Sequence, residues 1–258
     1  MERIKPMGLF LKDEPIQEDG TRMQGFARYR ELIERDHTRF LKAGLLTVLG
    51  FLPFAAGAVY SVLSSSFLLL LASSLIGGVI AGPFYACMQD IVYRSLRDDN
   101  RRFSDDYRKA MKQNFSGAIL PGCLLTLMIG IYSFMGVMMF YWAKALPSVS
   151  VIVLYLLGCY IFILLHTVIW PQLVLFRQPL TQSLRNALLF LARYLWKIMG
   201  LALIQMGFWA VIILFLPWSL ILIPFPGVWF ITFLTNFLMY NQMDEVFHIE
   251  ESIQAARQ

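Results

Sequence analysis

The chain has 258 residues, of which 58% are hydrophobic and only 15% are charged. Soluble domains carry about 25% charged residues, so the composition excludes an ordinary soluble domain and indicates a polytopic membrane protein. The formal net charge of +5 does not indicate binding to nucleic acid, because the cations flank apolar segments, where membrane orientation accounts for them.

We expect residues 1–42 to form a cytoplasmic N-terminal segment. Its first part, residues 1–20, is expected to be loose, and it contains no apolar stretch typical of a secretory signal peptide. Residues 21–42 are predicted to form an amphipathic helix, because apolar residues at three- and four-residue steps share one face. These residues are Met23, Phe26, Tyr29, Ile33 and Phe40. Two interpretations stay open, a helix on the membrane surface and a helix packed on the protein's own loops.

Six apolar segments follow, and about 20 apolar residues are enough to span a bilayer. We therefore predict an all-α, six-span membrane domain over residues 43–240, followed by an acidic cytoplasmic tail, residues 241–258. The first four predicted spans run from about Ala43 to Val62, Phe67 to Tyr93, Phe115 to Trp142 and Val151 to Phe176, and the last two end near Phe215 and Tyr240.

The second span contains small residues that predict close helix packing. Gly78 and Gly82 form a GxxxG pair, which lets helices approach closely. Pro83 is expected to kink the helix, because proline removes one backbone donor. In a polytopic protein we favour packing within the chain over dimerisation through this pair.

The loop between the second and third spans is rich in cations. Its cations are candidates for docking a partner protein or anionic lipid headgroups, and they are Arg94, Arg97, Arg101, Arg102, Arg108, Lys109 and Lys112. Ser104 is the expected N-cap of a short helix that lies along the membrane and turns near Asn114 into the third span.

A second amphipathic stretch, residues 181–197, adds Arg185 to the candidate docking residues. Three residues of the first loop recur with a constant offset of 77 positions, since Ser104, Arg108 and Ala110 match Thr181, Arg185 and Ala187. Either an internal repeat, of the kind common in transporters, or convergence of two capped amphipathic helices accounts for this match.

The distribution of cations predicts the orientation of the chain. Of its 22 Lys and Arg residues, Lys144 alone lies on one side of the predicted spans. The others lie in the N-terminal segment, the two loops described above and the tail. Because cytoplasmic loops carry the excess of Lys and Arg, we expect a multi-pass protein of the cell membrane with both termini in the cytoplasm.

Three polar residues within the spans form a candidate intramembrane site. His166 is the only ionisable side chain deep in a span, and such groups are functional candidates. Gln205 and Asn236 are either its partners or the lining of a polar path. Since no span centre carries an acidic partner, we favour a structural role for His166, a hydrogen bond to a neighbouring helix. Asp90, near the membrane boundary, is expected to pair with Arg94.

No motif indicates an enzyme. The chain has three histidines, with no pair at metal-ligand spacing, and it lacks the patterns of nucleotide-binding loops and activated nucleophiles. Cys87, Cys123 and Cys159 lie in apolar spans outside any CxxC pair and are expected to be small buried hydrophobes. We therefore expect no catalytic, cofactor-binding or metal site.

Two stretches resemble the YesL-like family of bacterial membrane proteins. The first combines Gly82-Pro83 with FSDDYRKAMKQNF, residues 103–115, and the second is LRNALLFL, residues 184–191. The resemblance implies a multi-span protein without an established activity, associated with carbohydrate uptake and ABC-type importers. It carries over no catalytic residue.

Two classes of function remain. In the first, the chain is a non-enzymatic accessory or regulatory component of solute uptake, whose charged loops bind importer subunits, lipid or a second copy. In the second, it is a small-solute transporter or channel, with His166, Gln205 and Asn236 along its path. The scarcity of polar residues within the spans favours the first class.

Overall fold

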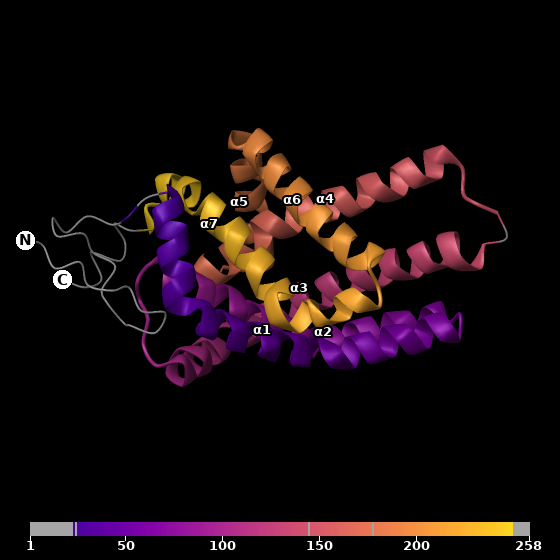
Figure 1. The fold of residues 1–258 in the computed structure, drawn as a ribbon, viewed down its shortest axis with the longest axis horizontal. Coiled ribbons are helices and arrows are strands. Elements are labelled where there is room, and N and C mark those ends of the chain that lie inside the picture. Colours follow the sequence, from indigo (N-terminus) through magenta and orange to yellow (C-terminus); the bar gives the residue numbers. More distant parts are fainter. Residues whose placement is uncertain (1–22, 24, 144, 177, 250–258) are drawn as a thin grey trace, which may run out of the picture.

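The computed structural model describes residues 23, 25–143, 145–176 and 178–249, and this part of the chain folds into helices without a strand (Figure 1). The α-helices are α1 (Gly25–Leu63), α2 (Phe67–Leu96), α3 (Phe103–Val137), α4 (Val149–Phe176), α5 (Leu180–Arg193), α6 (Leu195–Leu214) and α7 (Val228–Phe247). The π-turn η1 (Met138–Trp142) follows α3, and the 3₁₀ turn η2 (Trp218–Ile221) and π-turn η3 (Ile223–Gly227) join α6 to α7. The predicted all-α fold is confirmed.

Six of these helical segments are long and apolar enough to cross a membrane: α1, α2, α3 with η1, α4, α6, and η3 with α7. This finding supports the predicted multi-pass membrane protein. We call the end of the bundle at residues 97–102, between α2 and α3, the charged end. The opposite end, at the turn 64–66 between α1 and α2, is the apolar end. The predictions for residues 1–20, for Lys144 and for the tail beyond Ile249 lie outside the described residues.

The helix α1 is continuous, so the predicted amphipathic helix and the predicted first span are parts of one helix, and the boundary at Ala43 stays a prediction. Phe40, Ala43 and Thr47 are all buried, and their three- and four-residue spacing makes one uninterrupted packed stripe. Figure 1 shows the first turns of α1 running across the charged end and the remainder running along the long axis of the bundle.

The first turns of α1 pack on the protein itself. The ring of Tyr29 lies 5.5 Å from the ring of Phe233 and 5.4 Å from that of Phe237, both in α7. Of the two interpretations left open for this segment, packing against the chain's own elements is therefore the one observed, although its partners are both a helix and a loop.

The helix α3 is also continuous from Phe103, so the predicted turn near Asn114 is wrong. Ala110, Asn114 and Ala118 are buried, and the Asn114 side chain donates to the Ala110 carbonyl at 3.1 Å, inside the helix. The Ser104 prediction is wrong as well. Arg102 occupies the N-cap position without a side-chain cap bond, and the Asp106 carboxylate accepts from the Arg101 backbone N–H at 2.9 Å.

The second amphipathic stretch is divided into two helices. α5 ends at Arg193, Tyr194 leaves the helical conformation with φ −120° and ψ 33°, and α6 begins at Leu195. Buried Ala187 in α5 stands 77 positions after buried Ala110 in α3, and the two helices begin with the same offset. The starts of α3 and α5 are therefore alike in their helix boundaries and in one buried position. The origin of this likeness, an internal repeat or convergence, stays a prediction.

Small residues bring α2 and α3 together. A Cβ built on Gly82 would overlap backbone atoms of Ala118 and Gly122 in α3, and one built on Gly78 would overlap the backbone of Cys123. The Thr126 hydroxyl donates across the same interface to the Ser74 carbonyl at 2.7 Å. The GxxxG pair thus faces a helix of the same chain, and Pro83 is buried within α2, which continues to Leu96.

Candidate functional site

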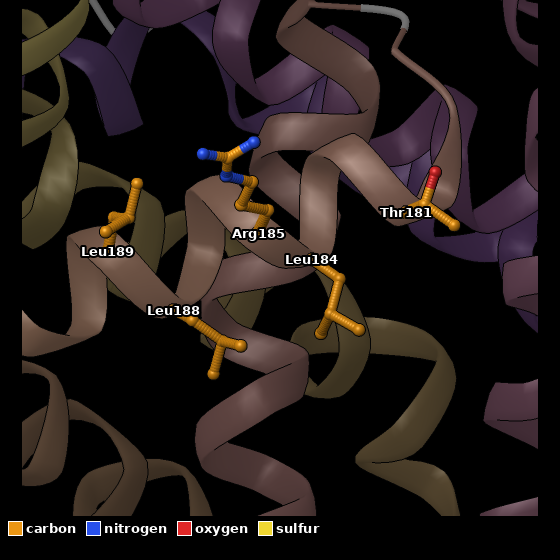
Figure 2. Close-up of a pocket in the computed structure, with 5 residues that line it drawn as sticks. All are labelled: Thr181, Leu184, Arg185, Leu188 and Leu189. Carbon is orange, nitrogen blue, oxygen red and sulfur yellow. The ribbon is translucent and has the colours of Figure 1, made fainter.

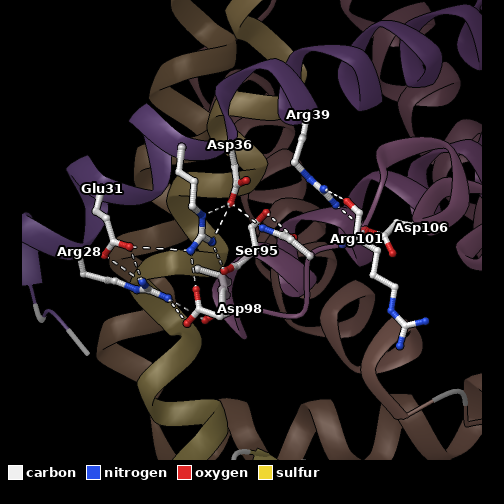
Figure 3. A network of polar contacts seen from close by, with 11 residues as sticks. Arg28, Glu31, Asp36, Arg39, Ser95, Asp98, Arg101 and Asp106 are labelled. Carbon is white, nitrogen blue, oxygen red and sulfur yellow. Dashed lines mark hydrogen bonds and ion pairs between the residues drawn. The ribbon is translucent and has the colours of Figure 1, made fainter. Parts of the chain in front are cut away.

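A network of ion pairs joins three elements at the charged end of the bundle (Figure 3). From α1, Arg28 donates to Asp98 at 2.7 Å and to both oxygens of Glu31, at 3.0 and 2.9 Å. Arg35 donates to the other oxygen of Asp98 at 2.7 Å and to the Ser95 carbonyl at 3.0 Å. The carboxylate that follows α2 is thus shared by two arginines of α1.

Asp106 connects the start of α3 to the same network. Its carboxylate is only 1% exposed and accepts from Arg39 of α1 at 2.6 Å. Arg94 of α2 lies 3.7 Å from its other oxygen and donates to Asp90 at 2.6 Å, which confirms the predicted pairing of Asp90 with Arg94. Because buried ion pairs leave an uncompensated charge when one partner is removed, these contacts fix α1, α2 and α3 relative to one another.

The pKa of Asp98 reflects this arrangement. Partial burial alone would raise its pKa, but the hydrogen bonds and charges of Arg28 and Arg35 outweigh burial, and the pKa of the carboxyl is lowered below its ordinary value. Asp98 also has φ +57°, a left-handed conformation that Asp adopts more readily than most residues. The residue that ends α2 is therefore also the residue that connects the network to α1.

Two of the seven candidate docking cations do not extend freely into solvent. Arg94 is 3% exposed and paired as described above, so its inclusion in an exposed docking surface is wrong. Arg97 is partly buried, and its Nε donates to the Tyr93 carbonyl at 3.2 Å.

The other five cations form what we call the basic face, and their side chains are exposed: Arg101, Arg102, Arg108, Lys109 and Lys112. Within residues 25–143, 145–176 and 178–249 none of these five side chains forms an ion pair. They surround the start of α3, directly beside the paired network. The ion pairs of that network therefore hold the backbone that carries the basic face.

Arg185 lies in a different setting from the basic face. It is on α5, and with Thr181, Leu184, Leu188 and Leu189 it lines a hollow of about 430 Å³ on one face of that helix (Figure 2). The three leucines are exposed, whereas Ala187 and Phe190 on another face of α5 are buried. A helix with exposed leucines and an arginine beside them suits the boundary between lipid headgroups and hydrocarbon.

The spans contain a chain of buried polar side chains that joins α2 to α7. Asn236 donates to Gln89 at 2.7 Å and accepts from the Tyr93 hydroxyl at 2.8 Å. Gln89 in turn donates to the Tyr85 hydroxyl at 3.0 Å. Each member therefore has a partner, as buried polar groups require.

The three predicted intramembrane residues do not form one site. The ring of His166 lies 5.4 Å from that of Tyr85, at one end of the polar chain, and its other ring contacts in the described part of the structure are with Phe162 and Trp170. Gln205 donates instead to Thr167 at 2.5 Å, in a separate pair between α6 and α4. The expected hydrogen bond from His166 to a neighbouring helix is thus not observed among the described residues.

Other features of the interior are small. A hollow of about 120 Å³ lies between α2, α3 and α4, lined in part by Asn114, Trp170 and Gln178. Gln172 is fully buried, and both polar atoms of its side chain lack a hydrogen-bond partner in the structure. No group of three metal-ligating side chains occurs among the described residues, and Cys87, Cys123 and Cys159 are free thiols.

Sequence reasoning missed the partners in both polar networks, although each has a periodic signal. Arg28, Arg35 and Arg39 are spaced by seven and four residues, so they share one helix face, and their partners are Asp98 in the loop after α2 and Asp106 in α3. Tyr85, Gln89 and Tyr93 are spaced by four and place a polar stripe on α2.

Comparison with protein-family models, with curated proteins and with solved structures finds no match to this chain.

Proposed function

We propose that this integral membrane protein is a non-enzymatic accessory or regulatory component of solute uptake, and that its basic face binds an acidic cytoplasmic surface of a partner protein. The observation that carries the proposal is the contrast at the charged end. Arg28, Arg35, Arg39 and Arg94 are paired with carboxylates, whereas the five neighbouring cations of the basic face extend outward. Cations that stabilise only the fold would be expected to pair in the same way.

The orientation of the chain supports a cytoplasmic partner. The positive-inside rule predicts that the charged end lies in the cytoplasm, where a soluble domain or subunit would have access to it. The ion-pair network fixes the start of α3, so binding requires little ordering of the backbone beneath the basic face, which favours affinity. Complementary charge also raises the rate of association.

The identity of the partner rests on the resemblance alone. The stretch at residues 103–115, which resembles the YesL-like family, includes Arg108, Lys109 and Lys112 of the basic face. We propose subunits of an ABC-type importer, acting on carbohydrate, as the partner. Self-association through the same face is the competing outcome, and it predicts a homo-oligomer without further subunits.

Transport by the chain itself is the second candidate, and one observation favours it. Among the described residues, the buried side chain of Gln172 has neither a donor nor an acceptor partner, and a polar solute or water passing through the bundle would satisfy it. Against this candidate, the hollow between α2, α3 and α4 measures only about 120 Å³, and the Tyr85–Gln89–Asn236–Tyr93 chain satisfies its own hydrogen bonds.

Co-purification tests the proposed function. The protein is purified in mild detergent after gentle crosslinking in its native membrane, and its partners are identified by mass spectrometry. Reversal of four cations, Arg101, Arg102, Arg108 and Lys109 to Glu, is expected to remove the partner while insertion is retained. Unchanged co-purification would exclude the basic face as the docking surface.

A matched control separates docking from charge in general. The double variant Arg108→Glu/Lys109→Glu is compared with Arg30→Glu/Arg193→Glu, which makes the same change in net charge. Arg30 and Arg193 are exposed and each pairs with one exposed or half-exposed glutamate, Glu34 or Glu245. Loss of the partner in the first variant and its retention in the second is the expected result.

A further inference from the structure

The hairpin of α6 and α7 is shorter than the two other hairpins of the bundle. Figure 1 shows the turns between α1 and α2 and between α3 and α4 extending along the long axis well past the turn between α6 and α7. Residue contacts give the same result. Trp229, at the start of α7, lies 5.9 Å ring to ring from Phe40, and a Cβ on Gly44 would approach its Cδ1 atom to 3.0 Å.

The extent of the shortfall follows from helix geometry. α1 continues from Gly44 to Leu63, which at 1.5 Å per residue adds about 28 Å beyond the level of Trp229. The rings of Phe208 and Phe230 lie 6.4 Å apart, so the turn starts from paired positions on α6 and α7. The chain from Phe208 to Phe230 leaves these positions and returns to them, so only half of its length carries it toward the apolar end. At helical rise that half extends about 16 Å. The turn therefore ends at least about 12 Å short of the apolar end.

The surface of the apolar end requires hydrocarbon. Leu63 is 71% exposed and Leu68 is 78% exposed on either side of the turn between α1 and α2. Exposed aliphatic side chains also cover the first half of α4, at Val153, Leu154 and Leu157. Since the hydrocarbon core of a bilayer is about 30 Å thick, it fits the length of α1 between Gly44 and Leu63, and the α6–α7 turn then lies within it.

The chemistry of the turn agrees with this depth. Residues 216–227 carry no charge, and their exposed side chains are apolar, with Trp218 86% exposed. Several polar groups of the turn are satisfied within the hairpin. The N–H groups of Ser219, Leu220, Leu222 and Gly227 donate to carbonyls within the turn or at the end of α6, and the Ser219 hydroxyl donates to the Ile212 carbonyl. Three prolines, Pro217, Pro224 and Pro226, have no N–H to satisfy.

We infer that α6 and α7 form a re-entrant hairpin, which enters the bilayer from the charged end, turns within the hydrocarbon core and returns to the same side. Its turn, residues 216–227, is an interaction surface for lipid acyl chains. Non-helical backbone is tolerated at membrane depth only where its polar groups are satisfied, and the N–H groups of Ser219, Leu220, Leu222 and Gly227 are satisfied within the hairpin. Four helices, α1 to α4, then cross the membrane, and both ends of the described chain stay on one side. The inference is independent of the proposed function.

Cysteine accessibility tests the hairpin directly. In a background with Cys87, Cys123 and Cys159 replaced by Ala, single cysteines are placed at Leu220 in the turn, at Ser64 at the apolar end and at Arg102 at the charged end. A membrane-impermeant maleimide is applied to either face of sealed vesicles. Ser64→Cys and Arg102→Cys are expected to react from opposite faces, and Leu220→Cys from neither face, although it reacts after denaturation in SDS.

Reaction of Leu220→Cys from the same face as Ser64→Cys would overturn the inference, because the hairpin would then cross the bilayer. A spin label at Leu220 gives a second readout in case the maleimide is blocked by the fold. Frequent collision with oxygen and rare collision with a water-soluble nickel complex is the expected pattern for acyl chains. Rare collision with both would place protein, such as a second copy, on the turn and would overturn the lipid assignment.

Discussion

Arg39 of α1 and Asp106 of α3 meet at 2.6 Å across the charged end of the bundle, although they are 67 residues apart in the chain. The Asp106 carboxylate also accepts from the Arg101 backbone and lies near Arg94. One nearly buried group therefore orders the first turns of α3 and connects them to both α1 and α2. The basic face surrounds this point, so its geometry depends on Asp106.

Replacement of Asp106 by Asn is expected to be strongly destabilising. The variant leaves Arg39 without its carboxylate in a buried setting, and breaking one partner of a buried pair costs about 3–5 kcal/mol. Thermal unfolding in detergent measures the effect. The control is Glu34→Gln, which removes the exposed partner of Arg30 and is expected to cost less than about 1 kcal/mol. Equal losses in the two variants would contradict the role given to Asp106.

The lowered pKa of Asp98 predicts a dependence of stability on pH. Its folded pKa lies below the unfolded value of about 3.9, so its contribution is complete above that value and is lost as the pH falls through the folded pKa. We expect the difference in Tm between wild type and Asp98→Asn to be largest near pH 7 and to shrink below about pH 4. A difference that is constant from pH 7 to pH 3 would show that the charge of Asp98 contributes nothing.

Two glycine substitutions distinguish packing from helix propensity. Gly82→Ala places a methyl group against the backbone of α3, and overpacking of this kind typically costs about 1–3 kcal/mol. Gly117→Ala in α3 meets nothing within 4 Å and is expected to be neutral or stabilising by up to about 1 kcal/mol, because alanine favours the helix. The yield of monodisperse protein and the Tm measure both. A tolerated Gly82→Ala would contradict close approach of α2 and α3.

The transport alternative makes its own prediction. If solute passes along the polar chain, removal of the His166 ring beside Tyr85 should abolish flux into proteoliposomes. Flux of His166→Ala at the wild-type level would exclude this residue from the path, and absence of flux in both proteins would argue against the class. The Gln172→Leu variant, which removes the buried amide, is the companion test. If solute passes the Gln172 side chain, this variant should lose flux while its stability is retained or increased.

The long apolar segments made the all-α membrane fold predictable, because length and hydropathy alone decide whether a helix is able to span. The continuity of α1 and α3 was not predictable in the same way. Ala43 and Asn114 were predicted as boundary residues from the change in polarity around them, but tertiary packing buries both and the helices run on. Depth in the membrane is likewise absent from hydropathy, since Trp229 and Leu63 lie in equally apolar surroundings.

The candidate site was predictable only in part. The positions of the cations were evident, and the i, i+4 spacing of Asp90 and Arg94 predicted their contact. The pairing of Arg28 and Arg35 with Asp98 joins positions 70 and 63 residues apart, which no local period encodes. The burial of Arg94 depends likewise on Asp106 of α3, 3.7 Å away, so Arg94 was included in the predicted docking surface, and the exposed cations became the basic face.

The most direct test of the account is site-specific photo-crosslinking from the basic face in the native membrane. A photoreactive amino acid is placed in turn at Arg102, Arg108 and Lys112, and at Arg30 as an exposed control outside the basic face. The account predicts that the three basic-face positions capture the same cytoplasmic protein and that Arg30 does not. Crosslinks to lipid alone, or equal capture from Arg30, would contradict a docking surface at the start of α3.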